Sequence, residues 1–339
     1  YSENLSKKKF ALDDELMKAY FKLEYVISGV FQTAEKLFGL SFVRNNEIPV
    51  YHQDVEAYEV YSGKELKAVF LADFFPRKGK RGGAWMTSYR DQKRTKNKNV
   101  IPQVSIVCNF TPSSPDTPSL LKFDEVKTLF HEFGHALHGM LSDTTYASLS
   151  GTNVYWDFVE LPSQILENWC FEKDCLDQFA RHYETNEPIP VDLVEKIKSS
   201  STYHEAYATV RQISFSLLDM AWHDISFEMA KEIEEVASVE KAVFGPLALF
   251  NPVDGTNMSV QFGHIFAGGY AAGYYSYKWA EVLDADAFSL FQEKGIFDKE
   301  TARSFRDTVL SKGGTVHPME LYKTFRGREP NPDALLKRA

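Results

Sequence analysis

The stretch Thr128-Leu-Phe-His-Glu-Phe-Gly-His-Ala-Leu-His138 contains His131, Glu132 and His135 in the spacing HExxH. On a helix, residues four positions apart lie about 40° apart on one face and roughly one turn apart, so two imidazoles can reach one ion. Glu132 then lies beside the ion without having to bind it. The pattern predicts that His131 and His135 bind one metal ion and that Glu132 acts as a general base.

The residues around this stretch predict that it is helical. Asp124 is the expected N-cap, and Glu125 falls in the first turn, where a carboxylate is favourable. Apolar residues recur at helical spacing and form one stripe, which consists of Val126, Leu129, Phe130, Phe133, Leu137 and Met140. We therefore expect a helix over residues 124–142. The alternative is that both histidines lie on a solvated helix surface and bind nothing.

Composition is typical of a globular chain and disfavours two classes of partner. The 339 residues are 44% apolar and can bury a sizeable core, and the formal charge of -9 argues against general nucleic-acid binding. One basic stretch runs from Arg77 to Lys98; we expect a solvated loop or hairpin surface there, with nucleic-acid binding as the weaker alternative. No run reaches the ~18 apolar residues of a membrane span, so no membrane partner is expected.

Cysteine usage and the start of the chain bear on its location. Cys108, Cys170 and Cys175 are few, odd in number and unevenly spaced, unlike a disulfide framework. They suit a reducing compartment, and the cytoplasm is the expected localisation. Residues 1–9 carry neither a signal-peptide pattern nor an initiator Met. We expect the chain to be part of a longer protein, so an upstream targeting signal is compatible with the sequence.

Hydrophobic periodicity predicts a mainly helical chain with one small sheet. Residues 48–118 contain short β-prone runs at 56–61, 67–75 and 103–110, and a tight hairpin turn is expected at Gly79, Gly82 and Gly83. The last of these runs lies just before the HExxH helix, and we expect Val104 to Asn109 to be an edge strand that pairs with a substrate backbone.

The rest of the chain reads as helix, and residues 1–339 are expected to form one catalytic region. Residues 1–47 are predicted to be helical, with a long helix over 13–40 that stops at Gly39. Residues 119–339 are predicted to be helical at 124–142, 157–177, 190–200, 203–222, 224–236, 238–249, 270–293 and 298–310.

Catalytic zinc usually has three protein ligands and one open position. In the extended pattern HExxHxxGxxH, positions 138 and 141 would be Gly and His, but they are His138 and Leu141. The third ligand must therefore come from elsewhere. The nearby downstream acids are Asp143, Asp157, Glu160 and Glu167.

Two of these acids remain open candidates on spacing alone. Asp143 lies too close in sequence to fold back onto its own helix, and Asp157 is the expected N-cap of the next helix. Glu160 and Glu167 lie about two turns apart on the same face of that helix. One of them can bind the metal while the other orients a ligating imidazole.

Three separated motifs, in this order, resemble the thimet oligopeptidase family of zinc metallopeptidases, in particular the C-terminal catalytic half of its bacterial oligopeptidase A and peptidyl-dipeptidase branch. The motifs are residues 131–138, residues 150–153 with 158–169, and residues 262–277. The resemblance implies a multi-helix zincin-type domain and one Zn²⁺ ion. It also implies that Glu160, in Phe158-Val-Glu-Leu-Pro-Ser-Gln164, is the third ligand.

The third motif places Tyr270, Tyr274 and Tyr277 at i, i+4 and i+7 of the helix expected at 270–293. From the sequence alone, aromatic packing is the better interpretation of such a stripe. The resemblance implies instead that His264, Tyr270 and Tyr277 contact the substrate or its developing oxyanion. It further implies that the substrate site is lined by Tyr274, Gly268 and Gly269.

The resemblance implies hydrolysis of peptide bonds in short oligopeptides, with Glu132 taking the proton of a zinc-activated water. Endopeptidase action and release of C-terminal dipeptides both stay open. The family's N-terminal half is absent and is an expected partner. A catalytically inactive zinc-dependent peptide-binding protein is the alternative, although such a protein would more often have lost Glu132.

Other histidines are weaker candidates. His204 and Glu205 begin a second HExxH-like string, but position 208 is Ala. His138 can pack near the site but is not needed as a ligand. The remaining histidines have no partner at ligand spacing and are expected to be structural or solvated; they are His52, His182, His223 and His317.

Overall fold

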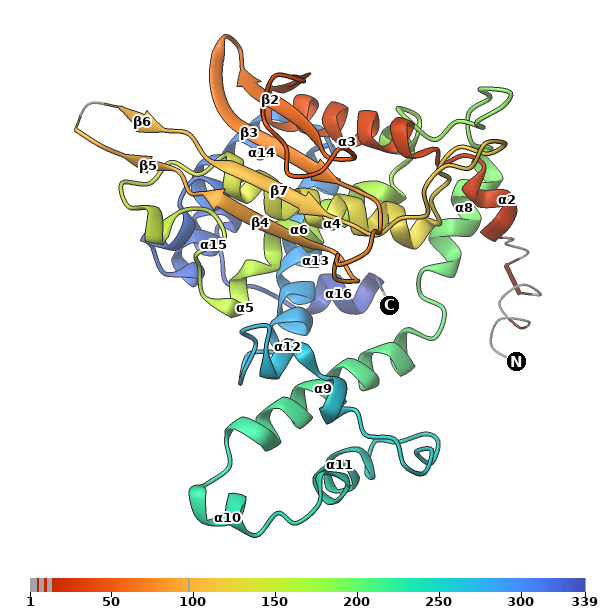
Figure 1. The fold of residues 1–339 in the computed structure, drawn as a ribbon, viewed down its shortest axis with the longest axis vertical. Helices are drawn as coiled ribbons and strands as arrows, with labels where there is room; N and C mark the ends of the chain where they lie inside the picture. The colour runs from red at the N-terminus through yellow and green to blue at the C-terminus, as the bar shows by residue number, and fades with distance from the viewer. Residues whose placement is uncertain (1–4, 6–8, 11–13, 97, 339) are drawn as a thin grey trace.

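The computed structural model describes residues 5, 9–10, 14–96 and 98–338 (Figure 1). Within these residues the molecule is mainly helical, with a five-stranded sheet of order β1-β2-β3-β7-β4 and a small β5–β6 pair. The sheet strands are β1 (Leu40–Arg44), β2 (Glu56–Ser62), β3 (Glu65–Asp73), β4 (Trp85–Arg90) and β7 (Gln103–Val107). The predicted fold class, mainly α with one small sheet before the HExxH helix, is confirmed.

The sheet topology corrects two expectations. β7 pairs with β3 in parallel and with β4 antiparallel, so residues 104–109 do not form an edge strand; the edges are β1 and β4. The connection through Gly79, Gly82 and Gly83 is not a hairpin turn, because β7 lies between the two strands that it joins. The tight turn is instead between β2 and β3, where Gly63 has φ 60°.

The basic stretch is mostly surface, as expected. It includes the hairpin of β5 (Lys93–Arg94) and β6 (Asn99–Val100), in which Arg94 forms an ion pair with Asp143 at 2.6 Å. Lys80 is an exception, because its ammonium is buried and lies 2.8 Å from the carboxylate of Asp73. Arg77 contacts the same carboxylate at 2.7 Å, so part of the stretch neutralises a buried acid.

The first predicted helix is two helices. Residue 13 lies outside the described residues; α2 spans Asp14–Lys18 and α3 spans Leu23–Phe38. The helix is interrupted because the backbone between them pairs elsewhere: Leu121 N–H donates to Phe21 C=O, and Leu23 N–H donates to Ser119 C=O. The predicted stop at Gly39 is confirmed, since Gly39 has φ 69° and caps α3.

The HExxH helix is α4 (Phe123–Met140), and its N-cap is Lys122 rather than Asp124. Glu125 still acts in the first turn, because its carboxylate accepts the Lys122 backbone N–H at 2.8 Å. One side of α4 packs on the sheet through Phe133, whose ring centroid lies 5.6 Å from that of Phe70. The apolar stripe of α4 is therefore buried, as predicted.

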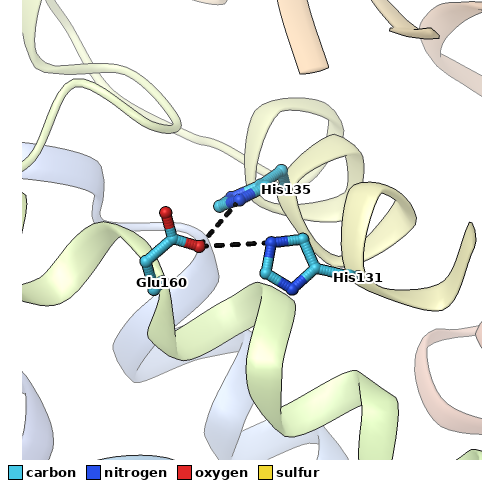
Figure 2. A group of neighbouring side chains, drawn as sticks. All are labelled: His131, His135 and Glu160. Atoms are coloured by element: carbon cyan, nitrogen blue, oxygen red, sulfur yellow. Dashed lines mark ion pairs between the residues drawn. The ribbon is translucent and has the colours of Figure 1, made fainter. Parts of the chain in front are cut away.

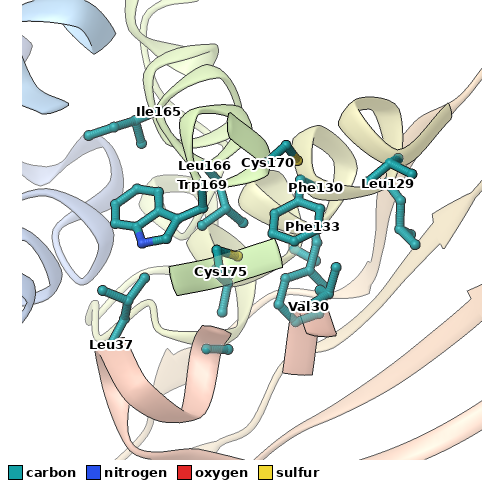
Figure 3. Close-up of a cluster of buried hydrophobic side chains, with 14 of the residues drawn as sticks. Val30, Leu37, Leu129, Phe130, Phe133, Ile165, Leu166, Trp169, Cys170 and Cys175 are labelled. Atoms are coloured by element: carbon teal, nitrogen blue, oxygen red, sulfur yellow. The ribbon is translucent and has the colours of Figure 1, made fainter. Parts of the chain in front are cut away.

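The other side of α4 packs against a segment that was expected to be one helix, 157–177. This segment is broken into α5 (Trp156–Val159), α6 (Leu161–Glu167), η2 (Asn168–Phe171) and α7 (Lys173–Leu176). Asp157 is inside α5, whose N-cap is Tyr155, and is not itself an N-cap. Figure 3 shows the core beneath, where Phe130 and Phe133 of α4 meet Leu166 and Trp169.

Most of the remaining helices match a predicted helix with different ends, but those at 263–266, 318–326 and 333–338 were not predicted. They are α8 (Val191–Ser200), α9 (Glu205–His223), α10 (Phe227–Lys231), α11 (Val236–Phe244), α12 (Gly263–Phe266), α13 (Ser276–Lys294), α14 (Lys299–Phe305), the π-helix η4 (Arg306–Leu310), α15 (Pro318–Arg326) and α16 (Asp333–Arg338). Short 3-10 turns occur at Ala147–Leu149, Ser259–Gln261 and Gly313–Thr315. The predicted helices 224–236, 238–249 and 270–293 are each shortened.

Residues 205–258, from α9 through α11 and the following loop, project from the body of the molecule (Figure 1). We call them the arm. The three cysteines, Cys108, Cys170 and Cys175, are buried and free. Across the described ranges, none of the helices has the combination of length and apolar character that a membrane span requires.

Candidate metal centre

Two imidazoles and one carboxylate meet where α4 packs on the α5–α6 junction (Figure 2). His131 Nε2 lies 3.3 Å from Glu160 Oε2, and His135 Nε2 lies 3.1 Å from the same oxygen. One ligand atom from each residue lies within 4.8 Å of the other two. Glu160 is at the break between α5 and α6, where Pro162 lies in the first turn of α6.

These distances fit a tetrahedral ion. Zinc bonds of about 2.0–2.1 Å at tetrahedral angles place neighbouring ligand atoms about 3.3 Å apart. The two separations from the imidazole nitrogens to Glu160 Oε2, 3.3 and 3.1 Å, are close to that value. Two neutral imidazoles with one carboxylate are also a donor set that suits zinc. In the part of the chain that the structure describes, this is the group of His, Cys, Asp and Glu side chains that can hold a metal.

Glu167, the other open candidate, contacts the far side of His131. Its Oε1 lies 2.7 Å from His131 Nδ1. Because a carboxylate at Nδ1 favours a proton on that nitrogen, Nε2 keeps its lone pair for a ligand. Glu160 and Glu167 therefore take the two positions that spacing could not assign, one at each ring nitrogen.

Ionisation in the group is strongly coupled. Burial would raise the pKa of Glu160, but the charges and hydrogen bonds of His135 and His131 outweigh it and hold that pKa well below its usual range. Burial would lower the pKa of His131, but Glu160 and Glu167 raise it well above its usual value. Glu160 is therefore ionised in this group. Its negative charge can balance a positive charge at the imidazoles, either a proton or a bound ion.

Glu132 lies beside this group and is 6% exposed. Its Oε2 is buried and has no hydrogen-bond partner among the described side chains and backbone groups. Burial raises its pKa, although His131 and His135 oppose the rise. The alternative prediction, in which this face of the helix is solvated, is therefore wrong. Glu132 instead offers a buried carboxylate oxygen that can accept a proton.

Two hydroxyl groups, from Ser163 and Tyr270, also hold Glu160. Ser163, one turn along α6, donates from Oγ to Glu160 Oε2 at 2.9 Å. Tyr270 donates from its hydroxyl to Glu160 Oε1 at 2.6 Å. Ser163 had not been singled out as a functional residue; its position three residues after Glu160 at a helix start was the available signal.

The predicted aromatic residues gather beside the centre, but Tyr270 and Tyr274 are on a loop that precedes α13, and Tyr277 is in the first turn of that helix. α13 begins only at Ser276, because Gly269 (φ 87°) and Ala272 (φ 53°) have left-handed backbone that breaks a helix. The Tyr277 ring centroid still lies 5.2 Å from those of Tyr270 and Tyr274 and 6.3 Å from His264.

The phenols of this cluster are donors at neutral pH. Burial and the charge of Glu160 raise the pKa of Tyr270 and of Tyr277. Each hydroxyl therefore keeps its proton and can donate a hydrogen bond to a negative oxygen. His264 is exposed at the edge of the cluster.

Two glycines of the third motif, Gly268 and Gly269, lie where the backbone closely approaches other groups. A Cβ on Gly269 would lie 2.9 Å from the Trp156 ring, and a Cβ on Gly268 would lie 2.9 Å from His264 C=O. The Trp156 ring in turn lies 4.6 Å from that of Tyr270. Trp156 had not been identified from the sequence as part of this region.

The weaker histidine candidates lie in other surroundings. His317 caps α15 and accepts the Met319 N–H, and His223 contacts Asp219. His52 lies 3.6 Å from Asp54, and His182 packs on Tyr20. His204 is the N-cap of α9 with φ 63°. His138 is fully buried, burial lowers its pKa to about 3, and its ring nitrogens have no partner within the described ranges.

Comparison with known proteins is consistent with this geometry. Oligopeptidase A of Escherichia coli (strain K12) is 42% identical over 99% of this chain and 50% of its own length. The dipeptidyl carboxypeptidase of Salmonella typhimurium is 40% identical over 99% of this chain and 49% of its own. The thimet-like oligopeptidase of Dictyostelium discoideum is 36% identical, with 99% and 50% covered. The chain thus spans about half the length of these curated relatives.

The fold and the whole length of the chain also match known proteins. The M32 carboxypeptidase from Deinococcus radiodurans R1 superposes with a TM-score of 0.52 at 16% identity, covering 99% of this chain and 64% of that chain, and shows a shared fold. The model described as Peptidase family M3 matches residues 1–339. The family expected from the three motifs is confirmed, and the chain belongs to peptidase family M3.

Proposed function

We propose that this chain carries, as one catalytic region, the active site of a zinc peptidase that hydrolyses peptide bonds in short oligopeptides. The observation that carries the proposal is the group of His131, His135 and Glu160 with the unpartnered carboxylate of Glu132 beside it. Membership of family M3, and relatives named as oligopeptidases, support the reaction and the substrate class.

The role proposed for Glu132 follows from its place and its ionisation. When bound by the three ligands, zinc supplies Lewis acidity, which polarises a carbonyl oxygen and makes a water molecule more acidic. Glu132 accepts the proton of the attacking water and then delivers it to the leaving amine. The Oε2 of Glu132 has no hydrogen-bond partner among the described residues, so it is free to take up the proton and to hold it between the two steps.

The tyrosines and His264 are proposed to receive the substrate and its developing negative oxygen. Tyr277 donates a hydrogen bond from its hydroxyl to that oxygen, aided by Tyr270 or His264. Loss of one such hydrogen-bond donor typically lowers the rate by about 100-fold to 1000-fold. Tyr274, Gly268 and Gly269 line the same region. The stacked rings of Tyr270 and Tyr277 support a shared task.

We propose that a polypeptide equivalent to the N-terminal half of the relatives covers the arm. Large apolar side chains stand exposed along it, a feature of surfaces that have a partner. They are Tyr207, Val210, Ile213, Leu217, Met220, Phe227, Met229, Leu247, Leu249, Phe250 and Val253. The relatives are about twice as long as this chain, which supports a partner of similar size. Co-expression of such a half should protect the arm from limited proteolysis.

We further propose a reducing compartment, the cytoplasm, as the location. The free cysteines are buried, and burial raises the pKa of Cys175 to about 12. A thiol with so little thiolate does not readily form disulfides. The chain has a formal net charge of -9, and Lys80 and Arg77 of the basic stretch already pair with Asp73. Nucleic acid is therefore an unsuitable partner.

The test compares Glu132→Gln with Asp124→Asn, which changes the same charge at an exposed position of the same helix. Zinc content is measured alongside cleavage of short peptides by mass spectrometry, with and without the N-terminal half. Glu132→Gln should retain zinc and lose at least about 100-fold in kcat, and Asp124→Asn should resemble the wild type. Near-normal hydrolysis by Glu132→Gln would show that the assigned role is wrong.

Two further results of the same assay decide between alternatives. A wild type that binds zinc and peptides but never cleaves them is the inactive binding protein. A peptide with a blocked C-terminus separates the two modes of cleavage, because an enzyme restricted to C-terminal dipeptides should not cut it.

A further inference from the structure

Residues 268–275, which we call the tyrosine loop, have a backbone that their own sequence does not favour. Ala272 has φ 53°, a left-handed backbone conformation that residues other than glycine rarely adopt. The loop has no regular secondary structure, yet it holds Tyr270 and Tyr274 beside Tyr277. Something outside the loop must therefore stabilise this conformation.

Asp219, on the last turns of α9, makes that contact. Its Oδ1 accepts the backbone N–H of Ala272 at 2.9 Å, and its Oδ2 accepts the backbone N–H of Tyr274 at 2.8 Å. Both oxygens are thus used on alternate residues of one strained turn. A carboxylate that accepts two backbone N–H groups is among the stronger hydrogen-bonding arrangements in proteins.

The surroundings of Asp219 make this contact mutual. The side chain is fully buried, and the imidazole Nδ1 of His223 lies 2.7 Å from Oδ1, within hydrogen-bond distance. A buried carboxylate is unfavourable unless its oxygens are hydrogen-bonded. Asp219 therefore depends on the loop amides as much as the loop depends on Asp219.

The loop then reaches the metal centre directly, because Tyr270 donates to Glu160 Oε1 at 2.6 Å. Just after the loop, in the first turn of α13, the Tyr277 C=O accepts from Gln164 Nε2 on α6 at 3.2 Å. The segment from Tyr270 to Tyr277 is therefore held by α9 on one side and by the residues around Glu160 on the other. Loss of the α9 contact is expected to displace the tyrosine hydroxyls.

We propose that Asp219 is a positioning residue that sets the tyrosine loop in the place from which Tyr270 and Tyr277 act at the metal centre. This inference rests on the proposed function for its catalytic consequence, but not for the structural contact. Because α9 is the first helix of the arm, Asp219 also links the arm to the site.

The test uses Asp219→Asn on the full chain. The amide offers one acceptor where the carboxylate has two, and its NH₂ group faces a backbone N–H. Asp224→Asn is the matched control, since it makes the same charge change at an exposed residue that follows α9. Asp219→Glu keeps the charge but moves the oxygens by about 1.5 Å, and serves if the asparagine variant does not fold.

Two measurements are needed, and the first requires no activity. Deuterium exchange of the segment 268–275 should be about 10-fold faster or more in Asp219→Asn, while α4 exchanges as in the wild type. In the zinc-loaded protein, kcat should fall by about 10-fold to 100-fold with KM within about threefold. Zinc content should not change, because the ligands lie on other elements.

Each outcome has a defined meaning. Unchanged exchange in the loop overturns the inference whatever the activity. Faster exchange with wild-type kcat overturns the positioning role. If the wild type cleaves no peptide, the proposed function fails, and exchange alone still decides whether Asp219 holds the loop.

Discussion

Gly134 lies on α4 between the two histidines of the metal centre, where α4 packs on α6. A Cβ at this position would lie 2.3 Å from Pro162 C=O and 2.6 Å from Ser163 Cα. These two residues follow Glu160 closely in the chain. We predict that Gly134→Ala pushes the start of α6 away from α4 and moves Glu160 away from both imidazoles.

The size of the effect follows from these contacts. The 2.3 Å approach is about 1 Å shorter than the 3.4 Å at which ordinary contact begins, so α6 must move by roughly 1 Å. Metal–ligand distances tolerate only about 0.2 Å. Overpacking lowers the free energy of unfolding by about 1–3 kcal/mol, and the upper end applies here because the backbone atoms of α6 cannot rotate away. The higher helix propensity of alanine offsets about 1 kcal/mol of this loss. We expect a net loss of about 2 kcal/mol in unfolding free energy, with zinc bound at least about 10-fold more weakly.

The assay separates the two effects. Urea unfolding of the metal-free protein measures stability, and competition with a chromophoric chelator measures zinc affinity. Gly29→Ala is the control, because Gly29 lies on α3, outside the metal group, and a Cβ there would lie 2.2 Å from the Phe179 ring. The control should lose stability without losing zinc affinity. If Gly134→Ala binds zinc as tightly as the wild type, the packing of α4 on α6 does not set the position of Glu160.

Three further predictions concern single contacts. Glu167→Ala removes the partner of His131 Nδ1 and should weaken zinc binding by about 10-fold to 100-fold, measured by the same competition. Burial would raise the pKa of Asp73, but Arg77, Lys80 and the hydroxyl of Tyr51 outweigh it and lower that pKa. The ionised Asp73 side chain should therefore stabilise the fold fully above pH ~3.9, and this stabilisation should be lost as the pH falls below that value. Urea unfolding between pH 7 and 3 should show the wild type losing its advantage over Asp73→Asn. Tyr322→Phe removes the 2.6 Å hydrogen bond to Asp286 and should cost about 1–3 kcal/mol in urea unfolding.

The sequence predicted α4 well because the features that define this helix all lie within its own residues. The apolar stripe and the spacing of His131 and His135 are properties of one helix, and the structure agrees to within two residues at each end. The third ligand was different. Glu160 and Glu167 both contact His131, at opposite ring nitrogens, so sequence spacing could not separate their positions.

The errors arose where distant segments decide local structure. The break in the helix expected at 270–293 depends on Asp219, more than fifty residues earlier in the chain, which stabilises left-handed backbone at Ala272. The strand at 103–107 was expected at an edge, but β4 pairs with it after an intervening connection. Pairing between separated strands leaves little trace in either strand.

Anomalous diffraction at the zinc absorption edge, from crystals of the zinc-loaded chain, tests the central claim most directly. We expect one peak about 2.0–2.2 Å from His131 Nε2, His135 Nε2 and a Glu160 carboxylate oxygen. A peak elsewhere, or no peak beside these three atoms in a protein that retains zinc, would contradict it.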